Sequence, residues 1–192
     1  DATRPAVGVD IKNLYKVFGP QPKKMMPLIA SGISKDELRD KHHHILGLRN
    51  INLNINPGAT QVIMGLSGSG KSTLVRHINR LIDPTAGEVW INGRDIMRLN
   101  RWSLRRFRRE QTAMVFQKFA LFPHMTVIEN VEFGLRVRGM SYKKRRATAQ
   151  NWIERVGLTG YEHSFPNQLS GGMQQRVGLA RALANDAPIL LM

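Results

Sequence analysis

The residues from 65 to 73 constrain the fold of this chain more than any other stretch. They read Gly65-Leu66-Ser67-Gly68-Ser69-Gly70-Lys71-Ser72-Thr73, and the spacing Gly-x4-Gly-Lys-Ser is that of a phosphate-binding P-loop. Residues 60–64 before the loop are apolar and favour a strand, and the residues after it have a helical pattern. A strand, a glycine loop and a helix in this order are the context that the motif requires.

Each residue type in this loop has a physical role in holding phosphate. Glycines lack Cβ atoms, so the backbone can wrap closely around phosphate oxygens, while the loop N–H groups and the helix N-terminus attract an anion. Lys71 can reach the β- and γ-phosphates as a point charge, and the Ser72 hydroxyl can ligate Mg²⁺. The alternative is an ordinary glycine-rich turn, but both the spacing and the context favour a phosphate site.

Composition excludes several classes of protein. The 192 residues suffice for one domain with a buried core, and 42% hydrophobic and 22% charged residues are typical of a soluble globular protein. No apolar run is long enough to span a bilayer, and the N-terminus lacks the apolar core of a signal peptide. With no cysteines, disulfides and thiolate metal sites are excluded, which suits a reducing compartment.

The net charge of +15 raises the question of a nucleic-acid or anionic-membrane partner. Helical spacing is plausible from Trp102 onward, and Trp102 and Phe107 are interleaved with basic residues in the way a nucleic-acid site requires. No base-reading module surrounds the cluster, so we favour a solvated basic helix whose aromatic side chains pack inward. The cluster consists of Arg98, Arg101, Arg105, Arg106, Arg108 and Arg109.

Alternating or continuous apolar residues predict strands, of which the last reads as a buried strand broken off at its end. The predicted strands are residues 7–14, 48–55, 60–64, 88–91, 112–116 and 189–192. Asn92 and Gly93 form a tight-turn pair after the fourth of these. The helix after the P-loop carries Leu74, Ile78, Leu81 and Ile82 on one stripe.

Two adjacent helices without an intervening strand indicate a helical subdomain inserted in an α/β body. Thr126 and Glu129 form a capping box that opens the first helix, and Ser141 can cap the second. The basic residues 143–146 lie near the N-terminus of the second helix, where the helix dipole disfavours positive charge. We therefore expect these residues to be buried or to have a partner.

Residues 20–44 have a different composition and read as an inserted, partly exposed excursion in which Ser34 can cap a short helix. His42, His43 and His44 could suggest a metal site, but adjacent residues do not share a helix face and no partner stands four residues on. We favour a solvated polar turn.

A second helix start suited to an anion follows Leu169. Ser170 is placed as an N-cap, and Gly171 and Gly172 leave the first-turn N–H groups uncovered. The alternative is a capped helix start whose glycines permit close packing, and the residues alone leave both interpretations open. The expected buried face carries Met173, Val177, Ala180 and Ala184.

Together, the P-loop, Gln117 and Leu169-Ser170-Gly171-Gly172 resemble the nucleotide-binding domain of ABC (ATP-binding cassette) transporters, over nearly the whole chain. Within that family, the sequence of these stretches is most similar to the ATPase subunits of glycine betaine, proline and choline importers. The stretches that carry this are residues 13–19, the 20–44 insertion, 62–67, 114–127 and 169–181.

The resemblance implies an α/β P-loop NTPase fold with an N-terminal antiparallel β region and an inserted α-helical subdomain, truncated at its C-terminus. Residues 1–123 would hold the β region and P-loop core, 124–169 the helical subdomain, and 170–192 the signature helix and the start of the acidic Walker B strand. The Asp and Glu expected after that strand are absent from the chain. Residues 1–192 alone are therefore expected to bind ATP but to hydrolyse it negligibly.

The resemblance also implies roles for matching residues. Phe18 would stack on adenine, Lys71 and Gln117 would serve catalysis, and Ser72 and Gln117 would ligate Mg²⁺. ATP held by the same chain would contact Phe18, Gly65, Ser67, Gly68, Ser69, Gly70, Lys71, Ser72 and Thr73. ATP held by a second copy would contact Ser170, Gly171, Gly172 and Gln174.

The implied assembly has two head-to-tail subunits enclosing two ATP molecules at the cytoplasmic face of the cell membrane. It would act with transmembrane permease subunits and, indirectly, with a periplasmic or extracellular substrate-binding protein, to import compatible solutes such as glycine betaine, proline or choline. A nucleic-acid-associated ABC ATPase and a non-catalytic interaction fragment are the alternatives. We do not expect nucleic acid as a partner, because no coiled coil or zinc module lies between P-loop and signature.

Overall fold

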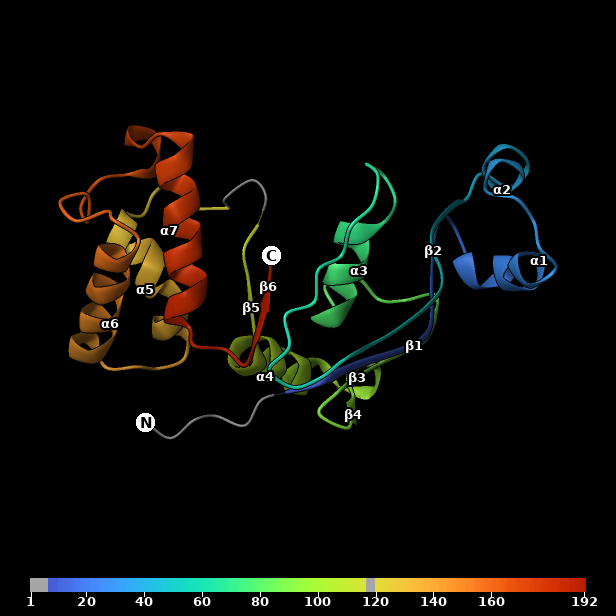
Figure 1. The fold of residues 1–192 in the computed structure, drawn as a ribbon, viewed down its shortest axis with the longest axis horizontal. Helices are drawn as coiled ribbons and strands as arrows, with labels where there is room; N and C mark the ends of the chain where they lie inside the picture. Colours follow the sequence, from blue (N-terminus) through green and yellow to red (C-terminus); the bar gives the residue numbers. More distant parts are fainter. Residues whose placement is uncertain (1–6, 117–119) are drawn as a thin grey trace. The chain divides into compact units, whose positions relative to one another are not determined.

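The computed structural model describes residues 7–116 and 120–192 (Figure 1). The chain divides into two compact units, residues 1–101 and 102–192, which are taken in turn. The finer division at residues 123 and 169 expected from the sequence stays a prediction.

The first unit is built on an antiparallel sheet with the strand order β2-β1-β3-β4, which confirms the predicted N-terminal antiparallel β region. Ile11, Leu14 and Val17 of the central strand are almost completely buried, so the core of this unit lies against β1. The strands are β1 (Val9–Phe18), β2 (Ile45–Ile55), β3 (Ala86–Ile91) and β4 (Arg94–Asp95).

Irregularities in β1 and β2 change which side chains face the core. Asn13 in β1 and Asn50 in β2 have left-handed φ angles of 47° and 50°, and the register between the two strands shifts near both. An extra residue in a strand moves all following side chains to the other face. Leu48 is therefore buried while Leu53, of opposite parity, is also partly buried. The strand predicted at residues 48–55 is formed, but its burial does not alternate uniformly for this reason.

The insertion forms three short helices with a core of their own: η1 (Pro22–Met25), α1 (Met26–Ala30) and α2 (Lys35–His42). The Ser34 hydroxyl accepts a hydrogen bond from the Glu37 N–H at 3.1 Å, which confirms the predicted cap. Ile29 and Leu38 pack with Val17 of β1 and Leu46 of β2. Figure 1 shows α1 and α2 at the end of the β1–β2 pair.

His44 contradicts the prediction of a solvated histidine turn, because it is only 4% exposed. Its Nδ1 lies 2.5 Å from the His42 carbonyl oxygen and its Nε2 lies 2.6 Å from the Pro20 carbonyl oxygen. The imidazole thus bridges the first and last residues of the insertion. The sequence could not predict this arrangement, because the partners of His44 are backbone carbonyls and any residue type supplies one.

The P-loop helix is α3 (Lys71–Ile78), and it is shorter than predicted. Arg80 takes a left-handed φ of 51° just after it, so Leu81 does not continue the buried stripe and is 46% exposed. The strand predicted at residues 60–64 is not formed, and Val62 and Met64 are 66% and 87% exposed. Strand propensity needs a paired neighbour, and no described strand pairs with this run.

The turn at Asn92 and Gly93 is confirmed. Both residues have left-handed φ angles, 50° and 73°, as the two-residue hairpin turn between β3 and β4 requires. The short helix η2 (Ile96–Arg98) follows, begun by the Asp95 carboxylate, which accepts from the Met97 N–H at 2.9 Å.

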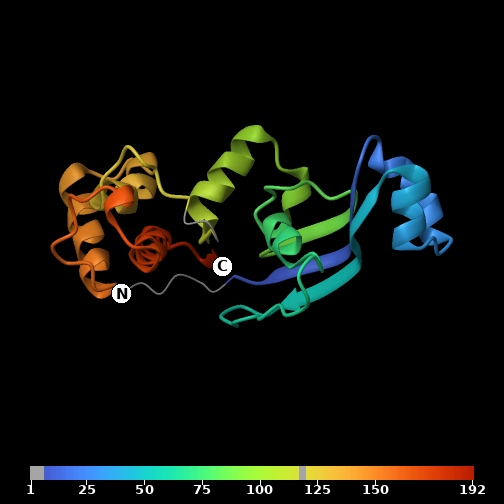
Figure 2. The same ribbon diagram turned by 90° about the horizontal axis from the view of Figure 1, so that it is seen from above.

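The second unit packs three helices into one core (Figure 2), and it also contains a short parallel strand pair. Val131, Ile153 and Val177, one from each helix, are completely buried. The buried face predicted for Met173, Val177, Ala180 and Ala184 is confirmed, with Met173 only partly buried. The elements are α4 (Arg101–Gln111), β5 (Thr112–Met114), α5 (Val127–Val137), α6 (Tyr142–Arg155), η3 (Pro166–Gln168), α7 (Gly171–Ala184) and β6 (Ile189–Leu191).

The capping box of α5 is confirmed, since the Thr126 N–H donates to the Glu129 carboxylate at 2.8 Å. Ser141 stands at the N-cap of α6 but makes no capping hydrogen bond. The basic start of α6 finds the expected partner in buried Glu132 of α5, which lies 3.5 Å from the Arg145 Nε. Among the described residues, no helix is both long and apolar enough to cross a bilayer.

Candidate functional site

The P-loop is held against β2 at a contact that admits no side chain. Gly70 precedes α3 with a left-handed φ of +95°, and a Cβ on it would lie 2.6 Å from the Gly47 carbonyl oxygen. Only glycine combines this backbone angle with so close an approach. The loop itself is exposed from Gly65 to Ser69, so its surface is accessible to a ligand.

Lys71 folds back over the loop that precedes it. Its ammonium group donates to the carbonyl oxygens of Gly65 and Leu66, both at 2.7 Å. The same group lies 3.5 Å from the Ser69 hydroxyl. A cation is thereby held at the mouth of the loop and beside the N-terminus of α3. This combination of a point charge and free helix N–H groups is suited to phosphate.

Phe18 lies in the same unit and close to the same contact. Phe18 is 38% exposed, and a Cβ on Gly47 would approach the Phe18 Cε2 to 2.7 Å. The Phe18 ring therefore lies where a side chain of Gly47 would be, and the Gly47 carbonyl lies where a side chain of Gly70 would be. The Lys16 ammonium lies 5.1 Å from the centre of the ring and donates to the Asp83 carbonyl at 2.8 Å. An exposed aromatic face is thus held near the phosphate loop.

His77 lies one turn after Thr73 on the buried side of α3, with no exposed surface. Its Nδ1 lies 2.7 Å from the Thr73 carbonyl oxygen, a geometry in which Nδ1–H donates. Burial lowers the pKa of His77 below its ordinary value, and the hydrogen bond to Thr73 opposes part of this effect. A neutral imidazole therefore supports the helix that carries Lys71.

The start of α7 presents an open surface. Ser170 caps the helix by accepting from the Met173 N–H at 3.3 Å. Among the described residues, a Cβ on Gly171 or Gly172 would meet no atom within 4 Å outside its own helix turn. Close packing against the described part of this chain thus gives no reason for the two glycines, and their surface is open to an external group.

Gln174 is directed toward its own chain. Its Nε2 donates to the carbonyl oxygens of Pro166 at 3.0 Å and Leu169 at 3.2 Å. It thereby fixes the turn through which the chain enters α7. Its predicted contact with ATP from a second copy stays a prediction.

Two predicted features remain to be placed. Gln117 lies outside the described residues. In the described ranges 7–116 and 120–192, no group of three His, Cys, Asp or Glu side chains could hold a metal. Ser72 is exposed at the first turn of α3. A Mg²⁺ ion often takes few protein ligands and completes its shell with phosphate oxygens and water, so this hydroxyl fits the predicted role.

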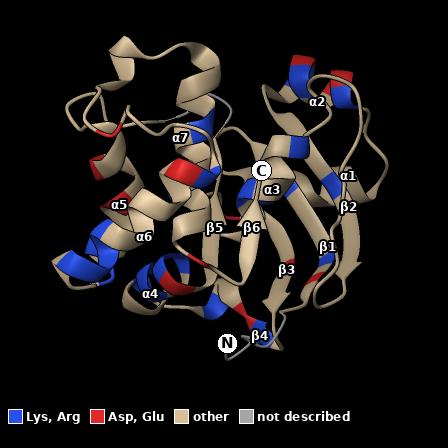
Figure 3. Ribbon diagram, turned by 60° about the vertical axis from the view of Figure 1, so that its left-hand side comes forward, with Lys and Arg blue, Asp and Glu red and all other residues tan. Residues whose placement is uncertain are grey.

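The basic helix α4 is only partly as predicted. Figure 3 shows Lys and Arg along α4 and at the start of α6. Glu110 pairs with Arg106 at 3.0 Å and Arg109 at 2.7 Å, in keeping with a solvated helix. Trp102, however, is 75% exposed with Arg105 lying 5.9 Å from its ring centre. The prediction that both aromatics pack inward was wrong for Trp102, because arginine covers one face of the indole instead.

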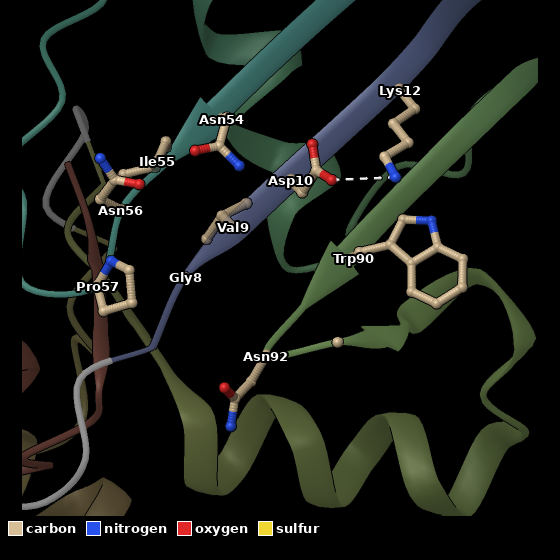
Figure 4. Close-up of a pocket in the computed structure, with 11 residues that line it drawn as sticks. Gly8, Val9, Asp10, Lys12, Asn54, Ile55, Asn56, Pro57, Trp90 and Asn92 are labelled. Atoms are coloured by element: carbon tan, nitrogen blue, oxygen red, sulfur yellow. Dashed lines mark ion pairs between the residues drawn. The ribbon is translucent and has the colours of Figure 1, made fainter.

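A cavity of about 430 Å³ lies on the outer face of the antiparallel sheet (Figure 4). Asp10 and Lys12 form an ion pair there at 3.2 Å, and the Lys12 ammonium lies 5.8 Å from the Trp90 ring centre. The charges of this cavity are satisfied internally, and none of the predicted site residues lines it. We therefore assign the candidate site to the P-loop.

Sequence reasoning missed Gly47 and His77. Gly47 lies in a strand far from the P-loop in sequence, and only the three-dimensional contact with Gly70 reveals its role. His77 carries a detectable signal, since it stands four residues after Thr73 on the buried stripe of the predicted helix.

A family model described as ABC transporter matches residues 48–192. The glycine betaine/proline betaine transport system ATP-binding protein ProV of Escherichia coli is 51% identical over 187 residues, 97% of this chain and 47% of that protein. The glycine betaine transport ATP-binding protein OpuAA of Bacillus subtilis is 49% identical over 97% of this chain and 44% of its own length. This chain thus spans about half the length of these curated relatives.

The fold is similar to that of a solved ATP-binding cassette, described as dimeric and bound to ADP and phosphate after hydrolysis. The TM-score is 0.79 with 39% sequence identity, over 95% of this chain and 72% of that one.

Proposed function

This chain belongs to the ABC transporter family, and on that premise we propose that the complete protein is the ATP-hydrolysing subunit of an importer for quaternary amines. The observation that carries the proposal is about 50% identity to glycine betaine importer subunits over 97% of the chain. The fold class expected from the sequence is confirmed by the family match and by the solved cassette.

We propose that the P-loop and Phe18 bind ATP. The exposed ring of Phe18 offers a face for the adenine base, and stacking on an aromatic is worth about 1–3 kcal/mol per base in nucleic-acid systems. The Lys71 ammonium lies 2.7 Å from two loop carbonyl oxygens, and phosphate oxygens would replace those acceptors. Phosphate is an anion, so the exchange gives Lys71 a stronger hydrogen-bond partner than a carbonyl.

Mg²⁺ would supply charge neutralisation to the phosphates, with Ser72 and Gln117 as its ligands from this chain. Gln117 also holds the proposed role of reporting occupancy of the site to the permease. The chain's own contribution to phosphate transfer is then positioning and electrostatic, which is how most of the catalysis arises in this chemistry.

Two subunits are proposed to assemble head to tail, so that the start of α7 in each subunit binds ATP held by the other. The support for this is the open surface around Gly171 and Gly172, which no group in residues 7–116 or 120–192 fills. The helix N-terminus there attracts an anion such as the γ-phosphate. Contacts made only in the closed pair would couple ATP binding to closure.

The permease and a substrate-binding protein are the proposed partners at the membrane, with this subunit on its cytoplasmic face. The solutes named for the relatives are glycine betaine, proline betaine and carnitine. We propose the same class of compatible solute here, including proline and choline.

The test is ATP hydrolysis by the complete protein reconstituted with its permease and binding protein. We expect hydrolysis that a quaternary amine stimulates and that Lys71→Ala abolishes. Val75→Ala, a smaller truncation on the same helix outside the loop residues 65–73, controls for damage to α3. Stimulation by an unrelated solute class alone, or full activity of Lys71→Ala, would contradict the proposal.

A further inference from the structure

The backbone directly after Phe18 lies beyond the paired part of the sheet. Phe18 and Ile45 form the last residue pair between β1 and β2, and Gly19 and Pro20 follow that pair. Gly19 has a φ of +138°, a conformation open to glycine, and proline has no N–H to donate to a strand. The position of this backbone therefore depends on contacts from outside the sheet.

His44 supplies those contacts. A Cβ on Gly19 would lie 2.5 Å from the His44 Cδ2 and 2.9 Å from its Cγ, so the imidazole lies directly against the Gly19 backbone. The His44 Nε2 lies 2.6 Å from the Pro20 carbonyl oxygen. A carbonyl oxygen only accepts, so this contact is a hydrogen bond in which the ring nitrogen donates. One side chain thus holds both residues that follow Phe18.

His44 is itself anchored by the insertion, residues 20–44. Its backbone N–H donates to the Leu38 carbonyl oxygen at 3.2 Å, at the end of α2. Leu38 is completely buried and packs with Ile29 in a core that the insertion shares with β1 and β2. The place of the imidazole is therefore set by the packing of the insertion as well as by β2.

The Phe18 ring has two further neighbours. A Cβ on Gly47 would approach its Cε2 to 2.7 Å, and the Lys16 ammonium lies 5.1 Å from the ring centre. Lys16 is fixed in turn by its hydrogen bond to the Asp83 carbonyl oxygen. Stacking on a base depends on the orientation of the aromatic face. A shift of the Gly19 backbone would change that orientation relative to both neighbours.

We propose that His44 is a positioning residue for the base of the nucleotide, which it serves by fixing the backbone that carries Phe18. Through His44, the insertion sets how tightly an aromatic base is held. The phosphates are held separately by the P-loop, whose contacts do not include His44. The inference rests on the proposed function, because it presumes that Phe18 stacks on the base.

The test compares two ligands of the complete protein, MgATP and magnesium tripolyphosphate, which has the phosphate chain without the base. His44→Leu keeps a side chain of similar volume and has no donor. We expect it to weaken ATP binding at least fivefold and to leave tripolyphosphate binding within twofold of wild type. Equal losses for the two ligands would overturn the proposal, because general damage to the fold would not distinguish them.

The matched control is His43→Asn. His43 is the exposed neighbour of His44 and has a φ of 55°, a left-handed angle that asparagine tolerates. Both ligands should bind this variant within twofold of wild type. A loss of ATP binding as large as that of His44→Leu would contradict a role specific to His44.

Two amide variants separate the two hydrogen bonds of the ring. Glutamine places its amide near the position of Nε2, which faces Pro20, and asparagine places its amide near Nδ1, which faces the His42 carbonyl oxygen. Because Pro20 follows Phe18, His44→Gln should bind ATP at least threefold more tightly than His44→Asn. Equal affinities, or tighter binding by His44→Asn, would overturn the proposal.

A double-mutant cycle tests whether His44 acts through Phe18. In a Phe18→Leu background, His44→Leu should weaken ATP binding less than twofold further, because the ring that it positions is absent. An undiminished fivefold loss in that background would show that His44 affects ATP by another route.

Deuterium uptake without nucleotide measures the hold on the backbone directly. His44→Leu should raise the initial uptake of residues 17–21 at least twofold and leave residues 65–73 unchanged, and His44→Asn takes its place if the leucine variant does not fold. Unchanged uptake at residues 17–21 would refute the positioning role. A wild-type protein that binds neither ATP nor tripolyphosphate would instead contradict the proposed function, and the uptake would still decide whether His44 holds this backbone.

Discussion

Gly47 and Gly70 touch where β2 meets the start of α3, and this single contact sets how the phosphate loop sits on the sheet. The Gly47 carbonyl fills the place that a Cβ of Gly70 would take, and the Phe18 ring fills the place that a Cβ of Gly47 would take. The candidate site therefore depends on two positions, Gly47 and Gly70, at which the structure leaves no room for a side chain. The P-loop motif predicts Gly70 from the sequence, but nothing local distinguishes Gly47 from an ordinary strand glycine.

Gly70→Ala tests this contact. Ala would have both an unfavourable φ of +95° and an atom 2.6 Å from a backbone oxygen. Gly68→Ala is the matched control, because Gly68 has a φ of +78° in the same loop but open space around it. We expect Gly68→Ala to cost about 1 kcal/mol of unfolding free energy, as a left-handed alanine does, and Gly70→Ala clearly more. Equal losses in denaturant titrations would show that the contact relaxes freely.

His77 predicts a pH dependence of the P-loop helix. Burial lowers its folded pKa below the unfolded value, which is about 6.5. The unfolded state then binds the proton more readily, so the stabilisation is present above about pH 6.5 and is lost as pH falls through the folded pKa. We expect hydrogen-exchange protection of α3 to decrease from pH 7.5 to pH 5.5, and this decrease to shrink in His77→Gln. Exposed His163→Gln should behave like wild type, and an equal response in both variants would assign the effect elsewhere.

At the scale of elements, capping and turn chemistry were predictable and strand pairing was not. The capping box at Thr126, the N-cap at Ser34 and the Asn92–Gly93 turn act within a few residues, so their sequence signals are complete. The run at 60–64 has every local preference of a strand but no described partner strand, so its preference is not realised. The shift at Asn50 likewise depends on the neighbouring strand.

The capping box of α5 gives a prediction for one element. Glu129→Ala should cost about 1 kcal/mol, because the Thr126 N–H and hydroxyl lose their acceptor. The hydrogen bond from the Thr126 backbone lowers the pKa of Glu129. Its contribution is thus present above the unfolded pKa of about 4.3 and is lost as pH falls through the folded value.

Urea titrations of the chain at pH 7 and pH 3 would measure this effect, with Glu129→Gln as the control that keeps a neutral acceptor. The difference between wild type and Glu129→Ala should be largest at pH 7. A difference that grows toward pH 3 would contradict the capping explanation.

At the scale of the whole molecule, the formal charge of +15 dominates encounters with polyanions. Arg101, Arg105, Arg106 and Arg109 of α4 are exposed, and Trp102 beside them is exposed with Arg105 over one face of its ring. Charge without a base-reading element attracts nucleic acid but does not select a sequence. Family membership could be predicted from three separated sequence motifs. Which basic side chains are exposed could not be predicted, because it depends on the three-dimensional packing.

Residues 1–192 should accordingly bind duplex DNA at low salt without sequence preference. Affinity should fall roughly a hundredfold between 50 and 200 mM salt, as for about four phosphate contacts. Replacing Arg105, Arg106 and Arg109 with Gln should flatten this salt dependence. Fluorescence anisotropy on two duplexes of unrelated sequence would measure it, and a clear preference for one duplex would instead support a nucleic-acid function.

The contacts of His44 with the backbone of the insertion bear on whether the insertion can be replaced by another segment. Phe18 at the end of β1 pairs with Ile45 at the start of β2, so residues 19–44 are the connecting loop of a β-hairpin. His44 fastens the two ends of this loop to each other through the carbonyls of His42 and Pro20. An exchange that keeps Pro20, His42 and His44 would retain this bridge, but it would also have to replace the contacts of Ile29 and Leu38 with Val17 and Leu46. The graft point adjoins Phe18, so a domain inserted here would act directly beside the ring proposed to hold the base.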